Sequence, residues 1–250
     1  MSNRPIYDIF LFVIKNHLQT FLLKRVSKAI GQYKLLTDGD KILLGVSGGK
    51  DSMTLLRLLM LKKNSLPVKF DLVAAHVDFG MNDGLSQRLE EHFREIGVQY
   101  HIERAALPGV PGEKKINCFW CAWNRRKTLF TLAKKYGCSK VALAHHLDDV
   151  VETYLMNLFF HGKVSAMPAK LKMFNGEFDL IRPMVLIEEK SIREYVKKMN
   201  IPHSTCVCPF FENSKRKYAE DLIKKLEKEC PQVRINLFRS MKRIENDFLI

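Results

Sequence analysis

One stretch, residues 42–61, constrains the fold more than any other part of the chain. The apolar run Ile42–Val46 predicts a short strand buried on both faces, and Asp51–Leu61 predicts a helix. Between them, residues 47–49 read Ser-Gly-Gly, a turn that requires small side chains. Glycines let the backbone approach an anion, the first helical amides point at that anion, and Lys50 adds a positive charge. The stretch predicts a phosphate-binding loop; the alternative is a tight glycine turn before an ordinary amphipathic helix.

The loop is not a Walker P-loop, because Leu44 and Asp51 occupy the positions where that motif needs a glycine and a serine or threonine. The sequence Ser-Gly-Gly-Lys-Asp-Ser instead resembles the signature of the ATP pyrophosphatases, the PP-loop superfamily. This resemblance implies that ATP is split between its α- and β-phosphates and that a substrate is adenylated. It also implies that the phosphates contact Ser47, Gly48, Gly49, Lys50, Asp51 and Ser52.

Strand and helix signals alternate after this loop. Apolar runs predict strands at 70–77, 98–102 and 140–144, and helical spacing predicts helices at 85–96, 120–136 and 147–160. Such alternation predicts an α/β fold with a doubly wound, mostly parallel sheet. Ligands of these sheets bind beyond the carboxyl ends of the strands. The phosphate loop, Asp78 and the run His145-His146-Leu147-Asp148-Asp149 all fall there, so we expect them to share one site.

Helical additions flank this sheet in our prediction. Ser191 and Glu194 have the spacing of a capping box at the start of a late helix, and residues 161–189 are irregular in pattern. The expected organisation is an N-terminal helical segment (1–35), an ATP-binding catalytic domain (36–188) and a C-terminal helical segment with a late cysteine loop (189–250).

Charge and cysteine content narrow the function. The 250 residues hold 41 Lys and Arg against 27 Asp and Glu, a net charge of +14, which favours a polyanion as partner. RNA is favoured over anionic lipid or a merely soluble basic surface. The apolar run Ile6–Ile14 is too short to span a membrane and lacks a cleavage site, so we expect a cytoplasmic protein without membrane contact. Six cysteines are too few for a disulfide scaffold in a chain this long.

Cys118 and Cys121 form a C-x-x-C motif at the start of a predicted helix, where the thiolate form is favoured. Together with Cys206 and Cys208 they have the ligand types of a zinc site. Three of them would hold an iron–sulfur cluster with one iron open, and a redox pair is a third alternative. Spacing alone does not choose between these sites. Cys138 and Cys230 are interpreted as structural.

The chain as a whole resembles the PP-loop tRNA thiolation enzymes, which have a HUP-like Rossmann-type fold, and among them the branch that makes 2-thiocytidine in the anticodon loop. Besides the phosphate loop, the motifs that carry the resemblance are the C-x-x-C followed by Arg125-Arg126, the Ala144–Asp149 run with Glu152-Thr153, Gly162-Lys163, Met167–Leu171, Ile181-Arg182-Pro183 and a late cysteine. The zinc-binding C-x-x-C pairs that the 2-thiouridine branch carries at its ends are absent from this sequence.

The resemblance implies a [4Fe–4S] cluster on three cysteines, two from the C-x-x-C and one from the late loop. The late loop departs from the family's Pro-Cys-x-x-Cys-Gly and reads Ser-Thr-Cys-Val-Cys-Pro from Ser204. Cys208 lies eight residues before Arg216, where the family's later cysteine falls, and Pro209 stiffens the loop behind it. We therefore predict Cys118, Cys121 and Cys208 as ligands, with Cys206 as the alternative to Cys208.

The expected reaction adenylates the carbonyl oxygen of a tRNA base and then replaces that oxygen by sulfur. Lys50, Asp51 and Asp149 are the predicted catalytic residues, the two carboxylates placing Mg²⁺. The sulfur donor is sulfide or the persulfide of a cysteine desulfurase, and a homodimer is expected from the resemblance.

Several side chains near these motifs have two interpretations. Arg125, Arg126 and Lys170 contact RNA or are solvated; His145 and His146 move protons or pack at a strand end. The last such pair is Trp120 and Trp123: they stack on a base or, in the favoured interpretation, one or both belong to the core. Two alternative functions stay open. One is another PP-loop adenylating enzyme, a 2-thiouridine-type thiolase or a small-substrate ligase with zinc. The other is a non-catalytic RNA-binding or sulfur-relay protein.

Overall fold

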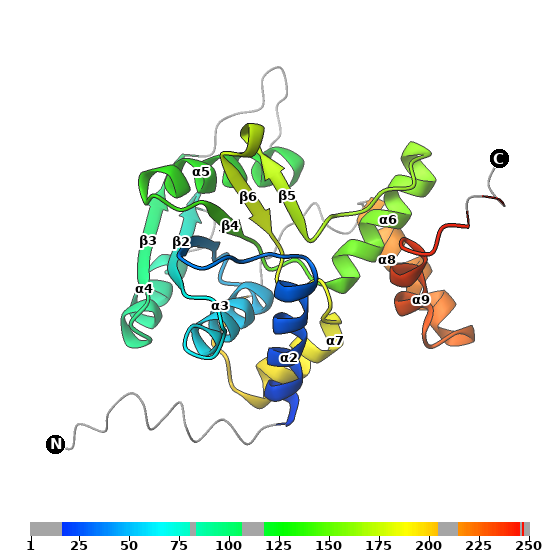
Figure 1. The fold of residues 1–250 in the computed structure, drawn as a ribbon, viewed down its shortest axis with the longest axis horizontal. Coiled ribbons are helices and arrows are strands. Elements are labelled where there is room, and N and C mark those ends of the chain that lie inside the picture. Colours follow the sequence, from blue (N-terminus) through cyan, green and yellow to red (C-terminus); the bar gives the residue numbers. More distant parts are fainter. Residues whose placement is uncertain (1–16, 81–83, 107–117, 205–214, 246, 248–250) are drawn as a thin grey trace.

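The fold is seen in a computed structural model, which describes residues 17–80, 84–106, 118–204, 215–245 and 247, apart from the side chains of Cys118 and Phe119. A six-stranded sheet in the order β3-β2-β1-β4-β6-β5 forms its centre (Figure 1). Neighbouring strands are parallel except β5, which runs antiparallel to β6. The strands are β1 (Asp40–Gly45), β2 (Phe70–Asp78), β3 (Gln99–Arg104), β4 (Lys140–Ala142), β5 (Lys170–Met173) and β6 (Phe178–Ile181).

Both faces of the sheet are covered, as the alternation of strands and helices predicts. One face packs against α2 (His17–Gln32), α3 (Lys50–Lys62), α4 (Leu85–Glu95) and α7 (Glu189–Lys198), and the other against α5 (Cys118–Lys135). Ile42, Leu43 and Leu44 of β1 are fully buried because helices lie on both sides of this central strand. The doubly wound, mostly parallel α/β fold is therefore confirmed.

The strand order reverses at β1, since β2 and β3 lie on one side of it and β4 on the other. Ligand sites of open parallel sheets form at such a switch point, where the two loops that leave neighbouring strands diverge. Here the loop after β1 carries residues 47–49, and the chain after β4 carries His145 and His146. The topology thus brings together two motifs that lie almost a hundred residues apart in the sequence.

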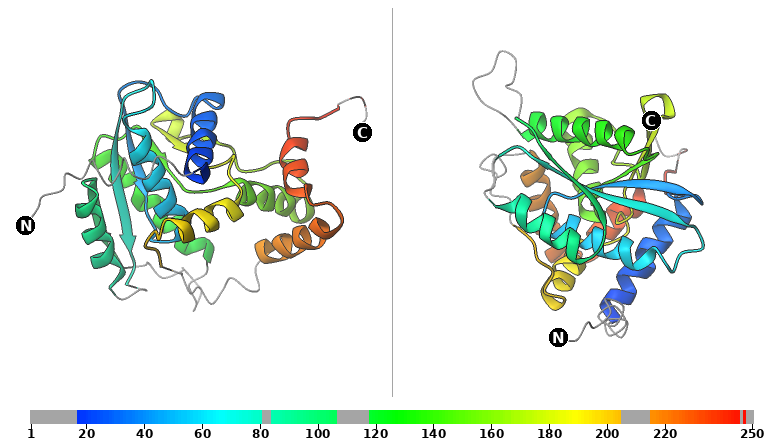
Figure 2. Two further views of the ribbon diagram at one scale, coloured as in Figure 1. Left: turned by 90° about the horizontal axis from the view of Figure 1, so that it is seen from below. Right: turned by 90° about the vertical axis from the view of Figure 1, so that its left-hand side faces the viewer.

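A separate helical layer stands beside the sheet. α6 (Leu147–His161), α8 (Lys215–Glu229) and α9 (Val233–Ser240) pack on one another at one end of the molecule (Figures 1 and 2). Leu147, Val151 and Leu155 of α6 bury Ala219 and Ile223 of α8 in a small core of their own. No helix within the described ranges is long and apolar enough to cross a membrane.

Two local predictions are wrong. α7 begins at Glu189 rather than at a Ser191 cap: its N-cap is Glu188, whose side chain makes no capping hydrogen bond. Residues 161–189, predicted as irregular, contain the β5–β6 hairpin, whose turn places Phe174 and Asn175 at positive φ. Strands of four residues are too short for a clear alternation of polar and apolar side chains, which is why the pattern did not reveal them.

Candidate active site

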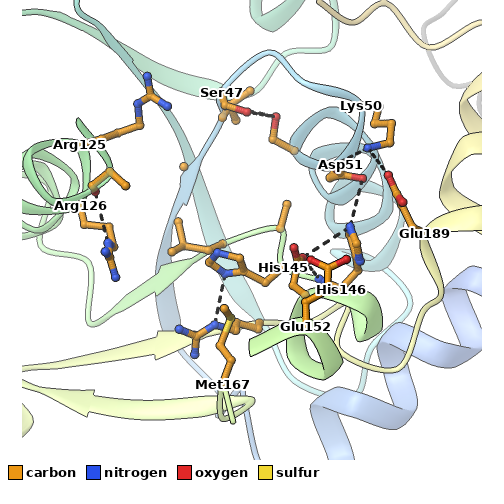
Figure 3. A pocket seen from close by; sticks show the side chains of 18 of the residues that line it. Ser47, Lys50, Asp51, Arg125, Arg126, His145, His146, Glu152, Met167 and Glu189 are labelled. Carbon is orange, nitrogen blue, oxygen red and sulfur yellow. Dashed lines mark hydrogen bonds and ion pairs between the residues drawn. The ribbon is translucent and has the colours of Figure 1, made fainter. Parts of the chain in front are cut away.

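A cavity of about 820 Å³ opens where β1 and β4 end, between α5 on one side and α6, α7 and α8 on the other (Figure 3). Charged side chains from five helices line it, together with polar side chains from the loops after β4 and β6. The lining residues discussed below are Lys50, Asp51, Arg125, Arg126, His145, His146, Asp149, Glu152, Arg182, Glu189 and Arg216. Its floor is apolar, with Val46, Ala75 and Leu129 among the lining residues.

The loop after β1 is held in shape by its own side chains. Ser52 Oγ donates to the carbonyl of Gly49 at 2.9 Å and lies 3.2 Å from the Oγ of Ser47. Gly48 has φ +82°, and a Cβ there would lie 2.9 Å from Cδ1 of Leu85, so any other residue would strain the backbone and displace that side chain. The carbonyl of Gly48 accepts a hydrogen bond from the amide of Ser204 at 2.8 Å. This bond fixes the chain immediately before the late cysteine loop against the phosphate loop.

Lys50, the first residue of α3, is shared between two carboxylates. Its Nζ lies 2.8 Å from Oε1 of Glu189 and 3.0 Å from Oδ2 of Asp51. Partial burial lowers the pKa of Lys50, but these two carboxylates outweigh burial and leave the pKa raised. Arg193 binds the second oxygen of Glu189 at 2.7 Å. The lysine is therefore charged, aimed into the cavity and held by partners that an incoming phosphate could replace.

Asp51 presents a carboxylate oxygen that has no partner. Its Oδ1 is buried and accepts no hydrogen bond from any residue that the structure describes, and Nε2 of His146 lies 3.9 Å from it. A buried carboxylate oxygen without a donor is costly, unless a cation or a proton meets it. This oxygen fits a Mg²⁺ ion that would arrive with a nucleotide.

His146 lies between three carboxylates. Its Nε2 is 3.5 Å from Oδ2 of Asp149 and 3.9 Å from Oδ1 of Asp51, and its Nδ1 is 3.5 Å from Oδ2 of Asp148. Burial lowers the pKa of His146, yet the three carboxylates raise it by more, so the net shift is upward. His146 is also the N-cap residue of α6, and its backbone amide donates to Oδ2 of Asp149 at 2.7 Å.

The neighbouring His145 has the opposite electrostatic surroundings. Burial, aided by the charges of Arg182 and Arg216, lowers the pKa of His145 to about 4. Arg182 donates from Nε to Nδ1 of His145 at 3.2 Å. A neutral ring that accepts at Nδ1 carries its proton on Nε2. His145 is thus a neutral hydrogen-bond donor at neutral pH, and a poor general base.

Asp149 and Glu152 on α6 share one cation. Arg216, at the start of α8, donates to Glu152 Oε2 at 2.7 Å and also binds Oδ1 of Asp149. Burial raises the pKa of Glu152 in spite of this arginine. For Asp149, burial is outweighed by His146 and Arg216, and the pKa is lowered. Both oxygens of Asp149 are already bonded, so this carboxylate is less ready to take a metal ion than Asp51.

The structure distributes the predicted site residues unevenly. Ser47, Lys50, Asp51, Ser52 and Asp149 line the cavity. Asp78 instead accepts hydrogen bonds from Gly80 and from Ser86 at the start of α4, and its neighbour Val77 reaches the cavity.

Predicted RNA contacts also divide. Arg125 and Arg126 line the cavity, whereas Lys170 is bound to Asp179 at 2.9 Å. Trp120 and Trp123 stack with ring centroids 5.3 Å apart, and Trp123 is 42% exposed, so the core interpretation is wrong for this residue.

The cysteines lie partly outside the described residues. Cys118 opens α5, and Cys121 follows one turn later, half-buried beside Ala122 of the cavity wall. The side chain of Cys118 and all of Cys206 and Cys208 fall outside. Cys138 is buried, and burial raises its pKa to about 11, as befits a structural thiol. Among the residues described, no three His, Cys, Asp and Glu side chains gather as a metal site.

Three residues of the site had no role in the sequence interpretation. Arg182 belongs to a recognised motif, but nothing in the sequence indicates that it faces His145. In the sequence, Arg216 is used only for its spacing of eight residues from Cys208. Glu189 has no local signal at all, because its importance comes from the contact with Lys50 that the fold creates.

Comparisons with known proteins identify the family. Residues 17–208 match the family described as the PP-loop domain. The tRNA-cytidine(32) 2-sulfurtransferase of Citrifermentans bemidjiense is 36% identical over 244 residues, which is 95% of this chain and 96% of the relative. The enzyme of the same name from Geobacter metallireducens is 38% identical over 231 residues, or 90% of each chain.

Solved structures agree with these relatives. The U34-tRNA thiolase NcsA from Methanococcus maripaludis, solved with its [4Fe–4S] cluster, superposes with a TM-score of 0.72 at 25% identity and covers 90% of this chain and 78% of that one. An NH3-dependent NAD synthetase from Campylobacter jejuni, with a TM-score of 0.50 at 13% identity over 91% of this chain and 93% of its own, shares the fold alone.

Proposed function

The chain belongs to the PP-loop family of ATP-using tRNA-cytidine 2-sulfurtransferases, and we propose that it makes 2-thiocytidine in the anticodon loop of tRNA through an adenylated base. The carbonyl oxygen at C2 of the cytidine attacks the α-phosphorus of ATP, and pyrophosphate leaves. A sulfur nucleophile then adds at C2, and AMP leaves with the original oxygen. The sulfur comes directly from sulfide, or from the persulfide of a cysteine desulfurase after a second thiol has reduced it, a step that releases sulfide and leaves a disulfide. The enzyme works in the cytoplasm.

ATP binds over the loop after β1. The phosphates contact the amides at the start of α3, the hydroxyls of Ser47 and Ser52, and Lys50, which exchanges Glu189 for phosphate oxygen. Gly48 and Gly49 keep the backbone close enough for these contacts, while Asp78 stays a prediction as a further nucleotide contact.

Asp51 is the proposed ligand of Mg²⁺ because its Oδ1 is buried and lacks a donor. When bound, Mg²⁺ supplies positive charge that offsets the leaving pyrophosphate. Asp149 would join it only after releasing Arg216, which ties any such movement to the helix that follows the late cysteine loop. His145, neutral and held by Arg182, donates a hydrogen bond from Nε2 to an oxygen of the bound nucleotide or base.

Cys118, Cys121 and Cys208 are the proposed ligands of a [4Fe–4S] cluster. Cys118 and Cys121 are three positions apart at the start of α5, a spacing that puts two side chains on one helix face. Ser204 is hydrogen-bonded to Gly48, so the late cysteine loop begins beside the phosphate loop, and Cys208 follows four residues later in the sequence. The ligand chemistry fits, since such clusters are held by cysteine thiolates. When bound, a three-cysteine cluster supplies an iron open to a sulfur atom.

One observation supports this function above the others. The helix that begins with the C-x-x-C and Arg216, just after the late cysteine loop, both line the cavity, and the residue before that loop is hydrogen-bonded to the phosphate loop. This arrangement supports the proposal that ATP chemistry and cysteine chemistry occur in one site. Arg125 and Arg126 on the same wall are proposed to bind RNA phosphates or those of ATP. The homodimer remains a proposal drawn from the family.

The test compares Cys208→Ala with Cys206→Ala, and with Cys230→Ala as a matched control at the exposed cysteine that directly follows α8. tRNA nucleosides are analysed from a strain that lacks the protein and expresses each variant; iron and acid-labile sulfide are measured after anaerobic purification. Cys208→Ala is expected to lose the cluster and 2-thiocytidine, and the other two variants to keep most of both.

Equal losses from Cys206→Ala and Cys208→Ala would indicate a closed four-cysteine site and contradict the open iron. Zinc without iron and sulfide would favour an adenylating enzyme of another kind. Normal 2-thiocytidine in the strain without the protein would overturn the function itself.

A further inference from the structure

Exposed aromatic and basic side chains gather at the far end of α6 and the beginning of α8. We call this group the aromatic–lysine patch; it consists of Phe159, Phe160, Lys163, Val164, Lys215 and Tyr218. Phe159 is 51% exposed, Val164 65% and Tyr218 60%, and exposed apolar side chains that gather in one patch mark an interaction site more than scattered ones do. Figure 1 shows this end of α6 standing clear of the sheet, with α8 beside it.

The rings in the patch are ordered against one another. The ring of Tyr218 meets that of Phe160 edge to face, with centroids 5.9 Å apart. Nζ of Lys215 lies 5.0 Å from the centroid of Phe160. These contacts hold two rings and a cation in a fixed arrangement at the surface, where Tyr218 is 60% exposed and Phe160 38% exposed.

Two short segments of the chain connect the patch to the active-site cavity. Lys163 donates its amide to the carbonyl of Asn157, and the Asn157 side chain donates to the carbonyl of Ser165 at 2.9 Å, so this segment folds back along α6. Two residues later, Met167 lines the cavity. On α8, Arg216 faces the cavity while Lys215 and Tyr218 face the patch. An RNA strand that left the cavity between Met167 and Arg216 would therefore reach the patch.

We propose that the aromatic–lysine patch binds the unpaired nucleotides that flank the cytidine bound in the cavity, an inference that rests on the proposed function. Bases of single-stranded RNA stack on aromatic rings, and lysines neutralise the phosphates between them. Tyr218 and Phe159 offer the ring surfaces, and Lys163 and Lys215 the charges.

Charge favours RNA over a second copy of the chain. The patch holds two lysines and no carboxylate, and Glu220 and Asp221 further along α8 are paired with Lys217. A two-fold interface sets one surface against itself, so it would bring Lys163 and Lys215 of both copies together. Anionic lipid would suit the charges as well, but a membrane gives no reason for the patch to run into the cavity.

The test measures binding of an unmodified tRNA transcript with a cytidine at the modified position, at fixed salt, by the full-length protein. Tyr218→Ala is expected to weaken binding by roughly 5- to 100-fold, the loss typical of one stacked base, and Tyr218→Phe to restore it because the ring remains. Lys215→Ala is expected to reduce the slope of log affinity against log salt by about 0.7.

Phe21→Ala is the matched control. Phe21 is 40% exposed on α2, away from the cavity, and the guanidinium of Arg25 lies 5.0 Å over its ring, so the same chemistry is removed from a remote surface. This variant is expected to bind tRNA like the wild type. ATP affinity, measured alongside, is expected to be unchanged in every variant.

The outcomes separate this inference from the proposed function. If the wild type thiolates tRNA and Tyr218→Ala binds tRNA with unchanged affinity, the patch assignment is wrong and the function stands. A change in oligomeric state without a change in tRNA affinity would assign the patch to a second copy. Loss of binding to phosphatidylserine vesicles alone would assign it to a membrane. A wild type that neither binds nor thiolates tRNA overturns the function first.

Discussion

The two walls of the cavity balance their charges differently. On the wall formed by the starts of α3 and α7, Lys50, Asp51 and Glu189 are each about a quarter exposed and form ion pairs of 2.8 to 3.0 Å. On the wall formed by α6 and α8, Asp149 and Glu152 are almost fully buried and depend on Arg216. The first wall has a cation that a phosphate can capture at little cost, since exposed pairs contribute little stability. The second wall holds buried carboxylates, and loss of their cation would lower the stability of the folded protein.

His146 connects the two walls, because its Nε2 lies 3.9 Å from Asp51 and 3.5 Å from Asp149. A nucleotide that captures Lys50 and a metal ion that binds Asp51 would both change the charge that this ring experiences. The comparison therefore separates binding residues on the first wall from stabilising residues on the second, with His146 between them.

Lys50→Ala should have the largest effect of the substitutions discussed here, and that effect should be a loss of activity. Loss of one preorganised cation at a developing charge typically costs about 100- to 1,000-fold, measured here as tRNA-dependent release of pyrophosphate. The melting temperature should stay close to that of the wild type, because the side chains of the lost ion pairs are partly exposed and water can replace the contacts. Lys63→Ala is the control: it breaks an exposed pair with Asp71 at the other end of α3. A Lys50→Ala variant that releases pyrophosphate at the normal rate would contradict the phosphate role of this wall.

The two histidines should affect stability in opposite directions as the pH falls. The folded-state pKa of His145 is about 4, below its ordinary 6.5, so the unfolded chain takes up the proton first. Its contribution is complete above pH 6.5 and is lost between pH 6.5 and 4, on the order of 3 kcal/mol in all. His146 has a raised pKa, so its contribution is present below pH 6.5 and is lost as pH rises through the folded value.

Denaturant unfolding of His145→Asn and His146→Asn at several pH values between 7.5 and 4.5 measures this difference. Relative to wild type, His145→Asn should lose less stability on acidification and His146→Asn should lose more. Parallel curves for all three proteins would show that the charge environments described for the two rings are wrong.

The sequence predicts the first wall better than the second, for a physical reason. A strand, a glycine turn and a helix start are consecutive, so their joint geometry follows from local pattern, and Lys50 lies where that pattern places it. Arg216 and Glu189 act through contacts with distant parts of the chain, which no local pattern contains. The β5–β6 hairpin was missed because Lys170 and Lys172 break the apolar run of a very short strand. The sequence does not tell which of the two tryptophans is buried; in the structure Trp123 stacks on Trp120 and is exposed.

Arg216→Met should have a smaller effect than the substitutions of Lys50 and of the two histidines, and that effect should be a loss of stability. The substitution leaves Asp149 and Glu152 buried without their cation; a fully buried pair broken in this way costs about 3–5 kcal/mol. The arginine itself is almost half-exposed, so water can replace part of its contribution, and a loss of about 1–3 kcal/mol is expected. Without Arg216 the two carboxylates should take up protons at higher pH in the folded state. The difference from wild type should therefore shrink as the pH falls from 7 toward 4, because protonation removes the uncompensated charges. Lys134→Met, which breaks an exposed pair with Glu177, should show neither the loss nor its pH dependence. A difference that stays constant with pH would mean that Arg216 stabilises the α6–α8 wall by packing rather than by charge.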